Sequence, residues 1–198
     1  LKAPLEAGEV TTVSKINTIA DGTAVQTPGD KLFPYLQANV DHVITVDDSE
    51  LTLSFLDMAE NHKMIVENSG LLTVAALKHL DFKGKKVVSV LSGGNMDVLT
   101  MATVVQNGLM QRDRIFTVSV MLPDKPGQLA AVSSLIAKEQ GNVIKLEHNV
   151  FANVNRTAGV ELTITLESFG TEHKDQIIKA LEAAGYCPVI TKTNGIYM

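Results

Sequence analysis

One alternating segment that ends in a proline-rich turn constrains the fold more than any other feature of this sequence. Residues 115–122 alternate apolar and polar side chains, the period of a strand with one buried face. The apolar positions are Phe116, Val118, Val120 and Leu122. Pro123 and Pro126 fix φ at about −65° and withhold two N–H donors, so the strand must end there. Gly127 permits a sharp turn into the next helix, whose free N–H groups suit a carboxylate.

The amino-acid composition predicts a globular protein and argues against nucleic acid and membranes as partners. The chain has 198 residues, 45% apolar and 20% charged, which is globular composition with enough length for a sizeable core. A net charge of −5 without any basic tract predicts that nucleic acid is not a partner. No run of about 18 apolar residues occurs, so no membrane association is predicted. The single cysteine, Cys187, fits a reducing, cytoplasmic location.

The last 85 or so residues predict one complete small domain. After the first strand, apolar residues at helical spacing predict a helix that Gly141 closes. Further along the sequence, the pattern predicts strands at 142–150, 160–167 and 186–191, a turn at 152–157 and a helix over 172–184. The order β-α-β-β-α-β is that of a ferredoxin-like sandwich, with two helices on one sheet face. A half-covered sheet favours association with a second copy.

The first 110 or so residues predict an α/β arrangement that is incomplete. A helix capped by Asp47 and Asp48 is expected first, and the remaining elements follow as a strand at 64–66, a helix over 71–80, a strand at 87–91 and a helix over 96–109. Two parallel strands are too few for a sheet covered on both faces. With the polar stretch 111–114 as linker, we expect domains at 1–112 and 113–198.

Residues that follow the predicted strands are the candidate ligand-binding groups. Ser92, Gly93, Gly94 and Asn95 follow the 87–91 strand, where open α/β sheets bind ligands. A plain strand-to-helix turn is the alternative interpretation. Glu67 follows the 64–66 strand and is expected to face a cofactor, to cap a helix or to be solvated. The five histidines show no metal-ligand spacing, so no metal site is predicted.

Four motifs in order resemble pyridoxal-phosphate-dependent threonine dehydratases that carry a C-terminal ACT domain. The motifs are Thr18 to Gly29, Ile65 to Glu67 with Gly70, Leu91 to Asp97, and the tail from Phe116. The resemblance implies part of a fold-type-II pyridoxal-phosphate enzyme lobe, and conversion of L-threonine to 2-oxobutanoate and ammonia. It also implies that Ser92 hydrogen-bonds the pyridine nitrogen of the cofactor. Gly93, Gly94 and Asn95 would then shape the turn around the ring.

Two family elements have no counterpart in this sequence: the Schiff-base lysine motif and the glycine-rich phosphate loop. We expect both to lie upstream of residue 1, which leaves no catalytic residue and no covalently bound pyridoxal phosphate in this chain. The chain alone is therefore expected to be inactive. Asn68 and Ser69 also replace a smaller Gly-Ala pair. Two alternatives are a non-enzymatic amino-acid-binding module and a fragment of a serine dehydratase or racemase-like lyase.

The ACT resemblance implies an effector site between two copies of the domain. One copy would contribute Asp124, Lys125, Pro126, Gly127, Gln128 and Leu129, and the other Asn142 and Val143. Turn N–H groups would hold the effector carboxylate, and Asp124 or the amide of Asn142 would take its ammonium. Isoleucine or valine is the expected effector, and a homo-oligomer through ACT domains is the expected assembly.

Overall fold

The computed structural model describes residues 1–149 and 159–193. The chain divides into two compact units, Leu1–Gly108 and Leu109–Met198. The turn predicted at residues 152–157 lies outside the described residues.

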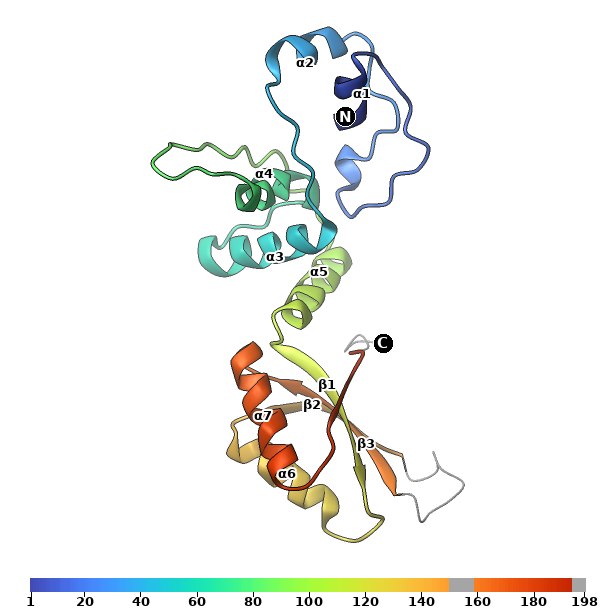
Figure 1. The fold of residues 1–198 in the computed structure, drawn as a ribbon, viewed down its shortest axis with the longest axis vertical. Coiled ribbons are helices and arrows are strands. Elements are labelled where there is room, and N and C mark those ends of the chain that lie inside the picture. Colours follow the sequence, from blue (N-terminus) through green and yellow to red (C-terminus); the bar gives the residue numbers. More distant parts are fainter. Residues whose placement is uncertain (150–158, 194–198) are drawn as a thin grey trace. The chain divides into compact units, whose positions relative to one another are not determined.

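The C-terminal unit is a four-stranded antiparallel sheet with two helices (Figure 1). Its strands are β1 (Ile115–Leu122), β2 (Asn142–Asn149), β3 (Val160–Glu167) and β4 (Val189–Thr191). Helix α6 (Gln128–Lys138) follows β1, and helix α7 (Thr171–Ala183) follows β3. The spatial order β2-β3-β1-β4 with this connectivity confirms the predicted β-α-β-β-α-β sandwich.

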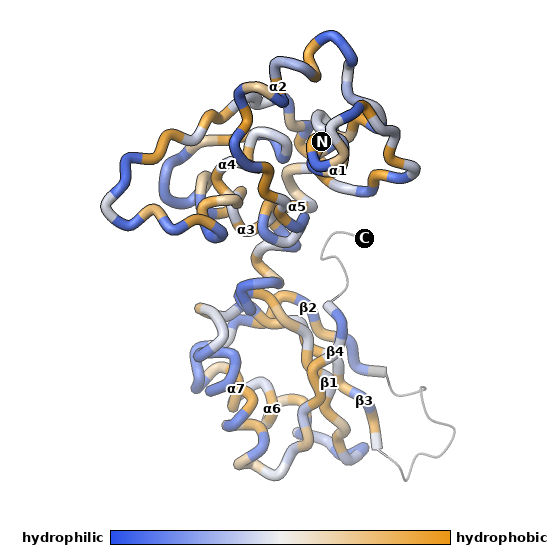
Figure 2. The backbone as a smooth tube through the Cα atoms, turned by 45° about the horizontal axis from the view of Figure 1, so that its top comes forward, coloured by the Kyte–Doolittle hydropathy of each residue, from blue (hydrophilic) through white to orange (hydrophobic). Residues whose placement is uncertain are grey.

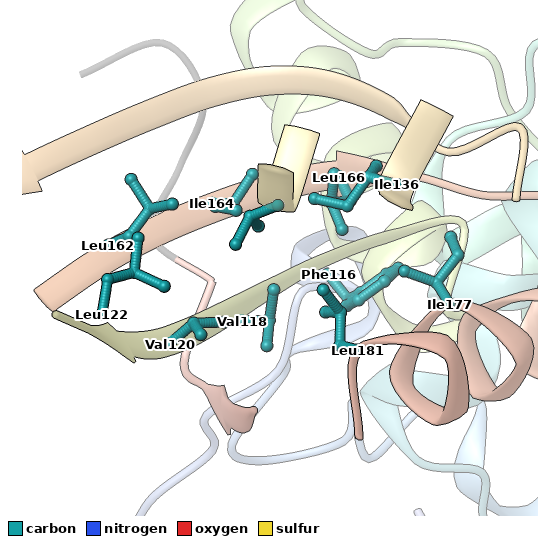
Figure 3. Packing of buried hydrophobic residues seen from close by; sticks show 11 residues of the cluster. Phe116, Val118, Val120, Leu122, Ile136, Leu162, Ile164, Leu166, Ile177 and Leu181 are labelled. Atoms are coloured by element: carbon teal, nitrogen blue, oxygen red, sulfur yellow. The ribbon is translucent and has the colours of Figure 1, made fainter. Parts of the chain in front are cut away.

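The core of this unit lies between one sheet face and the two helices (Figure 3). The four apolar residues predicted for the buried face of β1 are at most 4% exposed. Val132 and Ile136 of α6 and Ile177 and Leu181 of α7 pack against them. Figure 2 shows the apolar character of β1 along the tube. The alternation in sequence thus fixes which face of the sheet the helices cover.

The N-terminal unit is built from short helices and extended loops. Its longer helices are α1 (Lys2–Ala7), α2 (Phe33–Asn39), α3 (Asp48–Asp57) and α5 (Val98–Gln111), the last of which crosses the boundary between the units. A one-turn helix η1 (Asp21–Thr23) lies in the first loop, and a π-helical turn η2 (Met58–His62) extends α3.

Helix α3 begins at the predicted cap, where the N–H of Asp47 donates to the Glu50 carboxylate at 2.9 Å. The helix predicted over 71–80 is irregular: η3 (Asn68–Leu71), α4 (Leu72–Ala75) and η4 (Ala76–His79) follow one another.

The two parallel strands predicted at 64–66 and 87–91 are not formed, which corrects the sequence interpretation. Residues 1–108 are all described, and none of them is assigned to a strand. Figure 1 shows the region before α5 as an extended loop, and Val88 and Val90 on it are 89% and 65% exposed. A buried parallel strand needs hydrogen-bonded neighbours and covered faces, and these two short segments cannot supply both to each other.

Candidate functional site

Glu67 joins two of the motifs that the sequence singled out. Its carboxylate Oε2 accepts a hydrogen bond from the backbone N–H of Asn95 at 3.0 Å. Its own N–H donates to the carbonyl oxygen of Gly93 at 3.2 Å. These bonds hold the predicted cofactor turn at residues 92–95 against the segment that ends at Glu67. Glu67 also stands at the N-cap of η3 but makes no side-chain cap bond there, so its carboxylate contacts the turn, a role that the sequence did not suggest.

The glycines at this junction allow two backbones to approach closely. A Cβ atom placed on Gly93 would lie 2.2 Å from Oε1 of Glu67, far inside van der Waals contact. A Cβ atom on Gly70 would lie 2.8 Å from the Val66 side chain and 3.2 Å from the carbonyl oxygen of Gly93. Only residues without a side chain fit at these two positions without displacement of their neighbours.

The loop at residues 18–23 reaches the same place through two polar anchors. The Asp48 carboxylate, at the start of α3, accepts bonds from the Thr18 hydroxyl at 2.5 Å and the Ile19 N–H at 3.1 Å. The amide nitrogen of Asn68 donates to the carbonyl oxygen of Ile19 at 3.1 Å. Three motifs that are far apart in sequence therefore meet around Glu67 and Asn68.

A cavity of about 440 Å³ lies beside this junction. Its acidic lining groups are Asp21, Glu67 and Asp97, and none of the described residues that line it is a lysine or arginine. Asn68 also lines it, is 6% exposed, and keeps its Oδ1 atom without a hydrogen-bond partner. The hydroxyl of Thr100 and the N–H groups of the α5 start donate to Asp97 and lower the pKa of that carboxyl. The cavity therefore offers hydrogen-bond acceptors and negative charge.

The residues predicted to bind the cofactor form one continuous turn with an accessible face. Ser92, Gly94 and Asn95 are exposed and Gly93 is half-buried against Glu67. Asn95 also lines the cavity, whereas Ser92 does not. The Ser92 hydroxyl is exposed and can donate or accept a hydrogen bond, and the space beside Gly94 is open, since only the Ile65 carbonyl oxygen lies within 4 Å of a Cβ atom placed there. The Glu67 carboxylate occupies the corresponding space beside Gly93, so the exposed side of the turn, at Ser92 and Gly94, is the side compatible with a flat ring.

The predicted effector turn is an exposed, left-handed entry into α6. Gly127 has φ +88°, and residues 124–127 are exposed. The N–H of Lys125 is already bonded to the carbonyl oxygen of Pro123 at 2.8 Å, which tightens the turn. Gln128 and Leu129, in the first turn of α6, are half-buried. This arrangement is able to present backbone donors to a carboxylate.

The second half of the predicted effector site lies at the other end of α6. Asn142 begins β2, and its amide nitrogen donates to the Glu167 carboxylate at 3.1 Å, while Val143 is 38% exposed. Helix α6 has 11 residues and so separates the two halves by about 16 Å. One chain does not bring them together.

Sequence reasoning did not identify Asp48 or Asn68 as residues of the site. Asp48 was expected only to cap a helix, and Asn68 was noted only as a departure from the family pattern. Their roles depend on Thr18 and Ile19, which lie 29 to 49 residues away in sequence. A pattern within one short segment of sequence does not predict contacts between residues that are so far apart along the chain.

The described residues contain neither a candidate metal site nor a candidate membrane-spanning helix. Across residues 1–149 and 159–193, no group of three or more His, Cys, Asp or Glu side chains is placed to hold a metal ion. Within those same ranges, no helix combines the length and the apolar character needed to cross a bilayer.

Two family models match this chain. Residues 1–93 match the pyridoxal-phosphate dependent enzyme family, and residues 116–185 match the ACT domain family. Together they confirm the predicted fold class, a partial fold-type-II enzyme lobe followed by a ferredoxin-like ACT domain.

Curated relatives match most of the chain. An L-threonine ammonia-lyase of Geobacter sulfurreducens is 36% identical over 191 residues, which are 95% of this chain and 47% of that protein. One of Thermotoga maritima is 34% identical over 93% of this chain and 46% of its own length. A biosynthetic L-threonine dehydratase of Pasteurella multocida is 28% identical over 98% of this chain and 39% of its own length. The chain thus spans about half the length, or less, of these relatives.

Proposed function

Because this chain joins part of a pyridoxal-phosphate dependent enzyme to an ACT domain, we propose that it is the C-terminal portion of a threonine ammonia-lyase. The complete protein would convert L-threonine to 2-oxobutanoate and ammonia in the cytoplasm. The observation that carries this proposal is the convergence of the 18–23 loop, Glu67 and the 92–95 turn on one place. The names of the curated relatives support the choice of substrate.

The residues of this chain would hold one side of the cofactor ring. The Ser92 hydroxyl would hydrogen-bond the pyridine nitrogen, and Gly93 and Gly94 would let the backbone approach the ring. When bound, pyridoxal phosphate supplies an electron sink for the negative charge that develops on the substrate. A hydroxyl partner, unlike a carboxylate, leaves the pyridine nitrogen largely without a proton and so tunes that sink.

Glu67 would act on the cofactor through the turn and is a positioning residue. Its acceptance of the Asn95 N–H at 3.0 Å and its contact with Gly93 fix the backbone on both sides of Gly94. Because Ser92 precedes this turn directly, a shift of the turn would move the hydroxyl away from the nitrogen. Displacements of about 1 Å are enough to weaken catalysis strongly.

The ACT domain would bind a small amino acid and regulate the enzyme. The turn at residues 124–129 would hold the effector carboxylate, and Asn142 and Val143 of a second copy would complete the site. The separation along α6 supports a site shared between copies, and hence a homo-oligomer. Isoleucine or valine is the proposed effector, and its binding would couple two distinct sites.

A chimera tests the enzymatic proposal. The N-terminal part of the Geobacter sulfurreducens enzyme, up to the start of the matched region, would be fused to this chain and assayed with threonine and serine. We expect turnover of threonine by the chimera and none by this chain alone. A chimera that takes up pyridoxal phosphate but acts only on serine would favour the serine dehydratase or racemase-like alternative. Turnover by the unfused chain would refute the proposal that catalysis requires a Schiff-base lysine and a phosphate loop from outside this sequence.

A thermal-shift panel tests the regulatory proposal with the chain as it is. Isoleucine, valine, threonine and serine would each be added at increasing concentration, with ammonium chloride as the control for ionic strength. We expect a saturable rise in unfolding temperature with isoleucine or valine. Absence of a shift with all four amino acids would contradict a working effector site.

A further inference from the structure

The face of the ACT sheet opposite its helices carries a row of polar side chains across all four strands. Lys145 of β2 is in register with Thr165 of β3, Thr165 with Thr117 of β1, and Thr117 with Thr191 of β4. Side chains directly opposite in neighbouring strands share a face. The adjacent β1 residues Phe116 and Val118 point to the helices, so this row belongs to the other face.

Two hydroxyls in the middle of this row are buried although α6 and α7 both pack on the opposite face of the sheet. Thr117 is 4% exposed and Thr165 is 7% exposed, and their Oγ1 atoms lie 3.0 Å apart. In such a pair one hydroxyl donates to the other, which uses one of the two protons. The second proton is not used in this bond, and both threonines line the groove described next.

The row forms the floor of a groove of about 280 Å³, and the described residues that line it carry a net positive charge. Lys145, Lys192 and Glu147 are its charged lining residues, and Thr163 completes the lining together with the row. Lys145 contacts Glu147 at 2.7 Å and remains half exposed. Among the described residues no carboxylate lies within ion-pair distance of Lys192, so its charge is available in the groove.

We propose that this groove binds a small carboxylate, at a site separate from the effector turn at residues 124–129. The Lys192 ammonium would pair with the carboxylate, and the free Thr117 or Thr165 proton would donate to its second oxygen. Glu147 limits the net charge to +1, which suits one carboxylate better than a multiply charged phosphate. The proposal depends on the ACT sheet alone and not on the activity proposed for the complete protein.

Threonine methyl signals provide a direct test with the full chain. The protein would be labelled with methyl-¹³C threonine and titrated with sodium acetate against sodium chloride of equal ionic strength. We expect saturable shifts of the Thr117, Thr165 and Thr191 methyl signals with acetate only. The Thr171 signal, from the first residue of α7, should not move. Equal shifts with chloride, or shifts that depend on protein concentration and not on acetate, would overturn the proposal.

A matched pair of lysine variants tests whether the Lys192 charge is the one that binds acetate. Lys192→Gln should weaken acetate binding by roughly threefold or more, because a charge-assisted hydrogen bond is lost. Lys179→Gln removes the same charge from an exposed position on α7 and should leave the affinity unchanged. Equal effects of the two substitutions would mean that only the overall charge matters, and the specific site would be rejected.

Discussion

The Oε2 atom of Glu67 accepts the backbone N–H of Asn95 at 3.0 Å, across 28 residues of sequence. On its other side the same carboxylate fills the space that a side chain on Gly93 would need. This one contact fixes the conformation of the turn that we propose to hold the cofactor ring. It also connects the residues that follow the two segments of the N-terminal unit predicted as strands, 64–66 and 87–91.

Replacement of Gly93 by alanine should destabilise the N-terminal unit. The new Cβ atom would lie 2.2 Å from Glu67 Oε1, so the carboxylate must move and its bond to Asn95 is lost. We expect a decrease of about 1–3 kcal/mol in the free energy of unfolding, measured by urea denaturation. Gly29→Ala is the control, because no atom lies within 4 Å of its added Cβ. An equal loss in both variants would contradict the role assigned to Glu67.

The contact between Asp113 and Lys174 should make stability depend on pH. Burial opposes ionisation of Asp113, but hydrogen bonds from Lys174 at 2.7 Å and Thr171 at 2.8 Å outweigh it and lower its pKa. A lowered pKa in the folded state means stabilisation above the unfolded value of about 3.9. That stabilisation is lost as the pH falls below this value through the lower, folded pKa.

Two variants isolate this pH effect. Asp113→Asn should lose about 1–2 kcal/mol of stability at pH 6 and a smaller amount at pH 3, measured by urea denaturation at both values. Asp175→Asn, at an exposed position on α7, should follow the wild-type pH dependence. If the stability of Asp113→Asn depends on pH as that of the wild type does, the contact between Asp113 and Lys174 is not the source of the pH dependence.

Replacement of Gly127 by alanine should weaken the effector turn. Gly127 has φ +88°, which disfavours any residue with a side chain, while the space around it is open. We expect a cost of about 1 kcal/mol from the backbone alone and a smaller thermal shift with isoleucine or valine. Gly84→Ala is a matched control, since Gly84 has φ +75° and equally open surroundings. Its stability loss should be similar, but its amino-acid response should remain that of wild type.

Truncation of Ile164 should destabilise the C-terminal unit. Ile164 is fully buried at the centre of β3 and packs in the cluster between the sheet and the helices. Ile164→Ala should lower the free energy of unfolding by about 2–5 kcal/mol. Ile190→Ala, on β4 and 50% exposed, should cost much less. Far-ultraviolet circular dichroism during urea denaturation measures both, and equal losses would contradict the assigned core.

Most of the C-terminal unit was predictable because its signals are local. Alternation in residues 115–122 and 160–167 identified two strands and their buried faces, and the helical spacing after Gly127 identified α6. The last strand is shorter than predicted, since only Val189–Thr191 pairs with β1. In the N-terminal unit, apolar content at 64–66 and 87–91 favoured strands, but a strand also requires partners, and local composition does not report them.

In the C-terminal unit the sequence by itself determined the order of the helices and strands and the buried faces of β1 and β3, because these follow from spacing along one segment. The tertiary structure alone decided which turns meet. The contacts of Glu67 with Asn95 and of Asn68 with Ile19 span 28 and 49 residues, and the polar row from Lys145 to Thr191 depends on the register of four strands. Contacts at such separations result from chain folding as a whole, since many pairings are compatible with the same local pattern.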